Sequence, residues 1–187
     1  MAESKPGRRA AQIRNKLQEA IAILKELGFA AGQSNERAAY VLLALLDLLP
    51  SKPWAAAASP LRGTTPIIEF LSKSYAKDYK PNTRETIRDE AVKYFVDAGL
   101  LLRNPDKPDR ATNSAKTVYQ IEPTALALLR TYGTRFWTKQ LKHYLASRQE
   151  IRAHLERDRS MPRIPVSFSS GKKIASSPES VGEFWLG

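Results

Sequence analysis

The chain has 187 residues, no cysteine, and 30 lysines and arginines against 19 aspartates and glutamates, a formal net charge of +11. The absence of cysteine excludes disulfides and thiolate metal sites, and no apolar run reaches the roughly 20 residues of a membrane-spanning helix. The basic excess favours a polyanionic partner such as nucleic acid, although a surface tuned for solubility gives the same composition. The polar N-terminus lacks the apolar stretch of a signal peptide, so we expect a cytoplasmic protein.

The first predicted element is an amphipathic helix over residues 8–27. Apolar side chains recur there at every third or fourth position, and Gly28 ends the pattern. Arg8, Arg9 and Arg14 lie near its N-terminus, where the helix dipole disfavours cations. These arginines indicate either a basic arm that reaches a partner or a solvated tail, and the sequence leaves both open.

Two more helices are predicted in the next 50 residues. The first starts after a polar cap at Ser34 or Asn35 and ends at Pro50. Because it is apolar around most of its circumference, it should be the central buried helix. A loop follows, whose Trp54 should pack back onto the core, and Thr65 then caps a third, shorter helix.

A fourth helix is predicted over residues 83–100, with a polar and basic first turn. Asn82 and Glu85 fit a capping box, and Gly99 ends the helix. At about 100° per residue, its apolar side chains should share one face. They are Ile87, Ala91, Tyr94, Phe95 and Ala98.

The polar side chains of this helix are candidates for contact with a partner. Arg84 and Arg88 lie near the apolar face, so each either overhangs the core or pairs with a carboxylate at its edge. Thr83, Thr86 and Lys93 are better placed to point away from the core.

A β-hairpin is predicted next. Two strand-like runs, 100–103 and 117–121, flank a polar segment rich in proline and asparagine turn signals. The segment carries four cations that suit contact with a phosphate backbone, with a solvated loop as the alternative. They are Arg103, Lys107, Arg110 and Lys116. A short helix and a long helix over residues 135–158 follow.

Three helices followed by a two-stranded hairpin are typical of a winged helix-turn-helix fold. We therefore predict a mainly α fold with additional N- and C-terminal helices and a β-hairpin wing. The second helix of such a motif presents its N-terminal residues to the DNA major groove. This would explain a polar, basic tip on an otherwise apolar helix. We expect the winged-helix domain to span residues 1–159 and a tail to span 160–187.

Three segments of the chain resemble the N-terminal helix-turn-helix domain of the BsuBI/PstI restriction endonucleases. They are NTRET at the tip of the fourth helix, NPDKPDR in the hairpin and NSAKTVYQIE after it. The resemblance covers about residues 12–145. It implies a role in target recognition for type II enzymes that cut palindromic duplex DNA, CTGCAG in the best-known cases, with magnesium. It also implies a cognate methyltransferase at the same locus.

The residues predicted to contact double-stranded DNA lie on the fourth helix or in the wing. They are Asn82, Thr83, Arg84, Glu85, Thr86, Arg88, Lys93, Arg103, Lys107, Arg110, Asn113, Ser114 and Lys116. The resemblance adds Asn104 and Asp106 in the wing. The chain departs from the family just after Arg88, where Asp89 and Glu90 are unfavourable near phosphate unless one accepts from a cytosine amino group.

No catalytic residue or metal ligand can be assigned. A PD-(D/E)xK nuclease site holds magnesium with paired carboxylates and uses a lysine to assist the attacking water. Pro105 and Asp106 match the PD of this motif, but no Asp/Glu-x-Lys follows at a sensible distance. His143 and His154 are eleven residues apart on one helix, about 16 Å, too far for one metal. We expect no cofactor on this chain, and the tail to be the entry to an absent nuclease domain.

The favoured interpretation is the target-recognition domain of a BsuBI/PstI-like endonuclease, inactive by itself. A stand-alone winged-helix regulator of a restriction or defence locus is the main alternative. A complete small nuclease and a helical protein-interaction domain are two others, and the latter predicts no salt-dependent affinity for DNA. A palindromic target favours a homodimer. The helix over residues 135–158 either supplies that contact or braces the core.

Overall fold

The computed structural model describes residues 5–80, 83–111, 114–160, 166–167 and 173–174. The chain forms two compact units, Met1–Leu145 and Ala146–Gly187. The second contains the end of helix α7 and two short antiparallel strands, β3 (Val166–Ser167) and β4 (Lys173–Ile174). The expected domain boundary at residue 159 stays a prediction.

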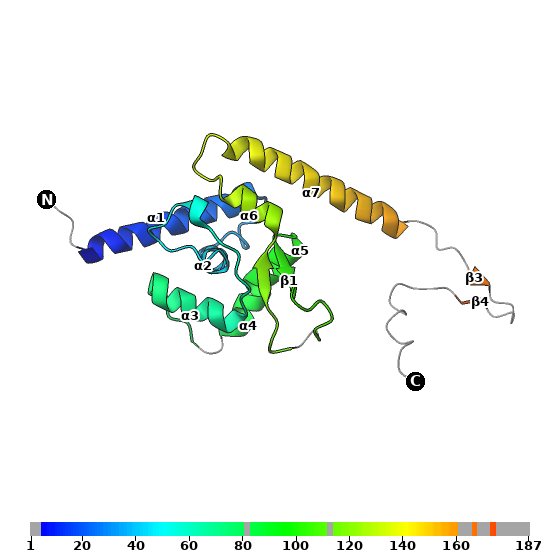
Figure 1. Ribbon diagram of the computed structural model, residues 1–187, viewed down its shortest axis with the longest axis horizontal. Coiled ribbons are helices and arrows are strands. Elements are labelled where there is room, and N and C mark those ends of the chain that lie inside the picture. Colours follow the sequence, from blue (N-terminus) through cyan, green and yellow to red (C-terminus); the bar gives the residue numbers. More distant parts are fainter. Residues whose placement is uncertain (1–4, 81–82, 112–113, 161–165, 168–172, 175–187) are drawn as a thin grey trace. The chain divides into compact units, whose positions relative to one another are not determined.

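The first unit has the element order predicted from the sequence, and it is a winged helix-turn-helix (Figure 1). The mainly α fold class is therefore confirmed. Its elements are α1 (Lys5–Glu26), α2 (Glu36–Leu45), η1 (Trp54–Ala56), α3 (Thr64–Tyr75), α4 (Thr83–Ile87), η2 (Arg88–Val92), α5 (Lys93–Asp97), β1 (Leu101–Arg103), β2 (Tyr119–Ile121), α6 (Pro123–Leu129) and the start of α7 (Trp137–Ser160).

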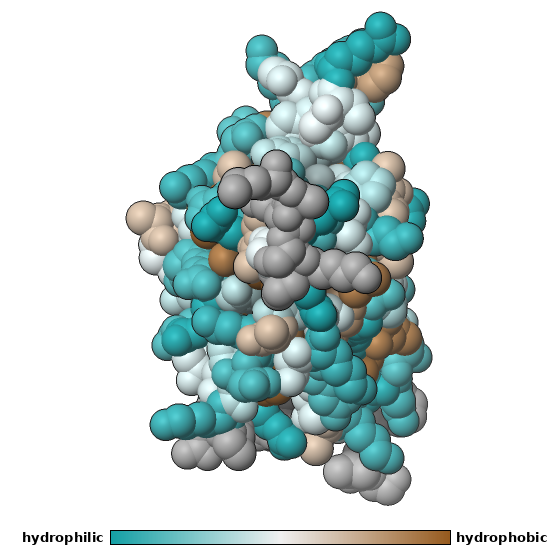
Figure 2. Space-filling view, turned by 90° about the vertical axis from the view of Figure 1, so that its left-hand side faces the viewer, coloured by the Kyte–Doolittle hydropathy of each residue, from teal (hydrophilic) through white to brown (hydrophobic). Residues whose placement is uncertain are grey.

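Helix α2 is the central element of the core, as its all-round apolar sequence predicts. Every residue from 38 to 45 is buried. The Asn35 side chain caps the helix, because its Oδ1 accepts from the Ala38 N–H at 2.9 Å. The indole of Trp54 packs against this core at 4 % exposure and donates to Glu19 at 2.8 Å. Polar residues predominate on the face that Figure 2 shows, as expected when the apolar side chains are used inside.

Helix α2 ends at Leu45, five residues before the predicted stop at Pro50. Asp47 adopts a left-handed conformation with φ of 50°, which turns the chain away from the helix axis. The Arg62 guanidinium donates to the Ala44 carbonyl at the helix end and pairs with the Asp47 carboxylate. A cation at this position also interacts favourably with the helix dipole. Arg62 thus caps the C-terminal end of α2, together with backbone hydrogen bonds from the Asp47 N–H to the Ala44 carbonyl and from the Leu48 N–H to the Leu43 carbonyl.

Arg62 also ties the helical core to the wing. Its backbone N–H and carbonyl both pair with Tyr119 of β2, each at 2.9 Å. Its guanidinium lies over the Phe70 ring of α3, 4.4 Å from the centroid. One residue therefore joins α2, α3 and β2, and it forms a one-residue third strand beside the hairpin.

Helix α3 packs on α2 and leads into the turn before α4. The Tyr75 hydroxyl donates to the Leu48 carbonyl at 2.6 Å, and burial raises the pKa of Tyr75. Ala76 ends the helix in a left-handed conformation with φ of 51°. The Arg9 guanidinium of α1 donates to the Lys73 carbonyl at 3.3 Å, which satisfies another carbonyl of this helix end. Arg9 therefore contacts the fold itself, whereas Arg8 and Arg14 are exposed.

We expect the substitution Arg62→Ala to lower the free energy of unfolding by about 1 to 3 kcal/mol. It removes a charge-assisted hydrogen bond, an ion pair and a stacking contact from a side chain that is only 16 % exposed. Urea denaturation of the first unit measures this change. Arg14→Ala, on the exposed face of α1, is the matched control and should change the value by less than about 0.5 kcal/mol. Equal effects of the two substitutions would contradict the role assigned to Arg62.

Candidate nucleic-acid interface

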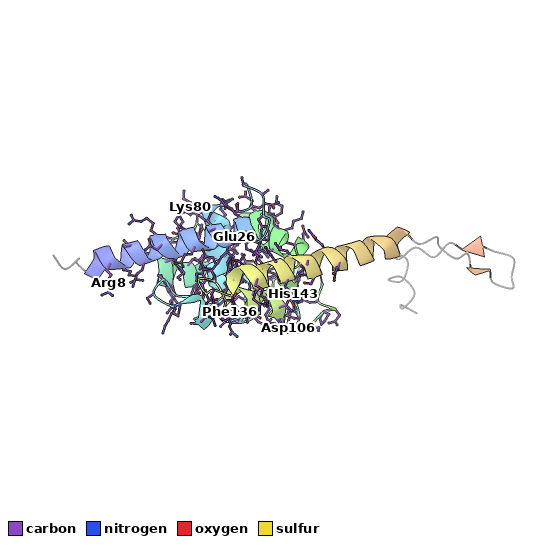
Figure 3. The ribbon with its side chains drawn as sticks, turned by 90° about the horizontal axis from the view of Figure 1, so that it is seen from above. Arg8, Glu26, Lys80, Asp106, Phe136 and His143 are labelled. Carbon is purple, nitrogen blue, oxygen red and sulfur yellow. The ribbon has the colours of Figure 1, made fainter. Side chains whose placement is uncertain are left out.

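The two regions predicted to contact DNA lie at the same edge of the first unit. In Figure 1 the start of α4 and the loop between β1 and β2 both lie at the lower edge. In Figure 3, Lys80 beside the start of α4 and Asp106 in the loop lie on opposite sides of this unit. The helix tip and the wing therefore share the lower edge of the unit in Figure 1 and are separated from each other across its width.

The predicted fourth helix contains a π turn in its middle. The Lys93 N–H donates to the Arg88 carbonyl, five residues earlier, instead of to the fourth residue back. This wider turn rotates the residues after it relative to a regular α-helix. Val92 is consequently buried at 1 % exposure, while Tyr94 is exposed at 36 %. The expectation that Tyr94 belongs to the apolar face is wrong, because it assumed uniform α-helical spacing.

One side of this helix is buried in the core, and its first turn is exposed on the other side. Ile87 and Phe95 are both fully buried, which supplies about 1.5 to 3 kcal/mol each. Arg84 and Glu85 are exposed, and Arg84 forms no hydrogen bond or ion pair with any residue that the structure describes. Arg84 therefore overhangs the core, the first of the two alternatives. Thr83 and Thr86 are half-buried, Lys93 is exposed, and the predicted cap Asn82 lies outside the described residues.

Two acidic residues of the π turn are neutralised by arginines. The Arg88 Nε lies 2.8 Å from Asp89 Oδ1, and its second terminal nitrogen lies 3.2 Å from Asp89 Oδ2. The hydrogen bond from Arg88 lowers the pKa of Asp89, and the same bond raises the pKa of Arg88. Glu90 pairs with Arg37 of α2. Arg88 thus has a carboxylate partner, as the second alternative expected, but the pair is exposed.

The wing is an antiparallel hairpin in which Leu101 faces Ile121 and Arg103 faces Tyr119. Asn104, directly after β1, is buried at 3 % exposure and has a left-handed φ of 47°. Its Oδ1 accepts from the Val118 N–H at 3.0 Å, which closes the base of the loop. Asparagine tolerates this conformation better than most residues, so Asn104 is a structural element of the wing.

Arg110 is held inside the wing. Its guanidinium donates to Asn104 Oδ1 at 2.9 Å and forms two hydrogen bonds with the Asp106 carboxylate, at 3.2 and 2.6 Å. The side chain is only 15 % exposed. The contact of Arg110 with DNA stays a prediction. In the structure its guanidinium N–H groups bind Asn104 and Asp106 and so hold the loop in shape.

The other predicted wing residues lie at the surface or outside the described part. Lys107 and Lys116 are exposed, and Arg103 is exposed with an interaction inside the protein. Ser114 is half-buried, and its Oγ accepts from the Lys116 N–H at 3.2 Å, so it shapes the turn. Asn113 lies outside the described residues.

Two residues of this region escaped the sequence prediction. Arg62 pairs with Tyr119 of β2 as a single residue, and one residue cannot show the alternating pattern of a strand. A lone arginine in a loop therefore does not indicate that it pairs with the wing. Asp89, unfavourable near phosphate by its charge, is the partner of Arg88. Side chains at adjacent positions of a regular helix do not face each other, so the sequence carries no signal for this pair.

The described residues contain no group of three or more histidine, cysteine or acidic side chains that could hold a metal ion. None of the helices in the described part of the chain has the length and apolar character needed to cross a membrane.

We expect Arg110→Ala to loosen the wing without unfolding the unit. Removal of the guanidinium leaves Asn104 Oδ1 with one donor and Asp106 without its partner, a local cost of about 1 to 2 kcal/mol. Hydrogen exchange at the Val118 amide should accelerate by about tenfold. Lys107→Ala, a neighbouring exposed cation, is the control and should leave this amide unchanged. An unchanged Val118 amide in Arg110→Ala would contradict the role.

The same ion pair makes the wing sensitive to acid. The hydrogen bond from Arg110 lowers the pKa of Asp106 below its ordinary value. Because the folded pKa is depressed, the stabilisation is present above about pH 3.9, the unfolded value, and is lost as the pH falls through the folded value. The Val118 amide resonance should report this step by NMR. Asp106→Asn should remove the step, and an acid step that survives in that variant would refute the assignment.

Comparison with known proteins identifies a family and two similar enzymes. Residues 14–153 match the family model of the BsuBI/PstI restriction endonuclease HTH domain. The chain is 47 % identical over 162 residues to the type II restriction enzyme BsuBI of Bacillus subtilis, covering 87 % of this chain and 51 % of that enzyme. It is 34 % identical over 164 residues to the type II restriction enzyme AplI of Arthrospira platensis, covering 88 % and 50 %.

A solved structure of SdaI restriction endonuclease superimposes with a TM-score of 0.66 at 34 % identity, covering 85 % of this chain and 50 % of that one. The chain spans about half the length of the curated relatives it matches. The family match extends over most of the first unit, including the helix tip and the wing. The chain belongs to the BsuBI/PstI restriction endonuclease HTH domain family.

Proposed function

We propose that this chain binds double-stranded DNA and recognises the target site of a BsuBI/PstI-like type II restriction endonuclease. The observation that carries the proposal is the exposed Arg84, which pairs with none of the residues that the structure describes and lies at the tip of a helix whose other side is buried in the core. Such a tip can enter the major groove while the helix body stays packed.

The wing supports the same function. Lys107 and Lys116 are exposed on a loop whose base is closed by Asn104 and whose interior is held by Arg110. A loop that is already ordered loses less conformational freedom on binding. Contacts from these lysines to phosphates would fix the register of the helix in the adjacent groove.

Strand cleavage and magnesium belong, in this proposal, to the half of the endonuclease that this chain does not match. The relatives are type II restriction enzymes by name, and this chain corresponds to about half of each. With magnesium present, the chain alone should bind plasmid DNA and leave it uncut. A palindromic target also favours two copies on one site, and a cognate methyltransferase remains part of the proposal.

We expect Arg84→Ala and Lys116→Ala each to weaken binding to duplex DNA. The Lys116→Ala substitution should act uniformly across sequences and reduce the slope of log K against log salt by about 1, because it removes one phosphate contact. Fluorescence anisotropy with CTGCAG and scrambled duplexes, across salt, measures both effects.

The control is Lys142→Ala, an exposed lysine on α7, which lies at the opposite edge of the first unit in Figure 1. It has the same change of charge and should leave affinity almost unchanged. Equal affinity of all three variants and the unmodified chain would remove the assignment of this face.

A further inference from the structure

An arginine and a carboxylate at the start of the π turn form an exposed ion pair. Arg88 and Asp89 are adjacent, and their side chains are 55 % and 57 % exposed. Two hydrogen bonds join them, from Arg88 Nε at 2.8 Å and from Nη2 at 3.2 Å. An exposed ion pair with a single bond contributes little to stability, but a two-point contact fixes the direction of the guanidinium plane.

The pair leaves one edge of the guanidinium available. The guanidinium has five N–H donors in a fixed plane. Asp89 takes the edge formed by Nε and one hydrogen of Nη2. The hydrogens of Nη1 and the second hydrogen of Nη2 remain at the end of the side chain. This end is the two-donor fork that matches O6 and N7 of guanine in the major groove.

The pair lies on the recognition helix close to the wing. Glu90, the next residue, is bound to Arg37 and therefore faces α2. Arg88, Asp89 and Arg103 all lie close enough to the Tyr119 hydroxyl of β2 to affect its pKa, which burial raises. The pair therefore lies near β2 of the wing, whose Arg103 faces Tyr119 across the hairpin.

The charge of the pair favours contact with a base rather than with phosphate. Asp89 cancels the charge of Arg88, so the unit adds little to the general attraction for a phosphate backbone. A free arginine would serve phosphate better, and an acidic neighbour would then only weaken it. A neutral unit with an oriented donor fork is instead suited to reading one base pair.

We propose that Asp89 orients Arg88 so that its free fork donates to O6 and N7 of one guanine in the target. Arg88 is the base-contacting residue and Asp89 is a positioning residue. The inference rests on the proposed function, since it requires that the chain binds duplex DNA.

Two substitutions test the donor geometry of Arg88 and its orientation by Asp89 one at a time. R88K keeps the positive charge but loses the planar fork. D89N keeps the size of the side chain but offers one acceptor oxygen in place of two. Both side chains are more than half exposed, so the fold should persist, which circular dichroism checks. D97N, another exposed carboxylate on the same helix, is the control for the change of charge.

The experiment selects bound sequences from a randomised duplex pool with the full chain and the three variants. We expect the unmodified chain to enrich guanine at one position by about tenfold or more. R88K and D89N should lose that preference at the same position, while D97N keeps it. D89N should also bind random duplexes more tightly, because it gains net positive charge.

Three outcomes would overturn the inference and leave DNA binding in place. These are no guanine preference in the unmodified chain, unchanged preferences in R88K and D89N, and an R88K loss of affinity that is equal for all sequences, which indicates a phosphate contact. Failure of the unmodified chain to bind any duplex would overturn the proposed function itself, and the inference with it.

Discussion

The recognition helix has to bury one side along its whole length while its first turn projects into solvent. Ile87, Ala91, Val92 and Phe95 are all buried. At regular α-helical spacing Ile87, Ala91 and Phe95 share one face, but Val92 would lie about 140° away from Ile87. The π turn brings them into phase, at the cost of one irregular hydrogen bond. The same rotation turns Tyr94 outward. Arg88 and Asp89, at the start of the π turn, are more than half exposed. The π turn therefore lies within the candidate reading surface and sets which later residues of the helix face the core.

The wing depends on a different kind of order, in which polar groups satisfy one another. Asn104, Asp106 and Arg110 form a closed set of hydrogen bonds inside a loop that has few apolar side chains to bury. Two wing lysines remain exposed around this set. The cations of this hairpin therefore differ in role. Arg110 holds the loop in shape, whereas Lys107 and Lys116 are exposed on its surface. Arg62 then couples this loop to α2 and α3.

Much of the fold follows from local sequence patterns, and the departures have identifiable causes. The cap at Asn35 and the apolar run of α2 are patterns within a few residues, which the sequence shows directly. The hairpin pairs residues far apart in the chain, such as Leu101 and Ile121, but turn signals between two strand-like runs predict it. The left-handed turn that ends α2 falls on Asp47 rather than on a glycine, and Arg62, which also caps this end, is 17 residues after Leu45. The π turn violates the constant spacing on which a helical face is predicted. Arg110 and Lys116 look alike as wing cations, and only the loop geometry separates them.

The central claim is that one face, made of the recognition helix and the wing, meets duplex DNA. Hydrogen exchange of the full chain with and without duplex DNA tests it most directly. The account predicts new protection of backbone amides over residues 83–93 and 104–118, with the start of α7 over residues 137–145 unchanged. Protection confined to other parts of the chain, or none in either segment at a DNA concentration that saturates binding, would contradict it.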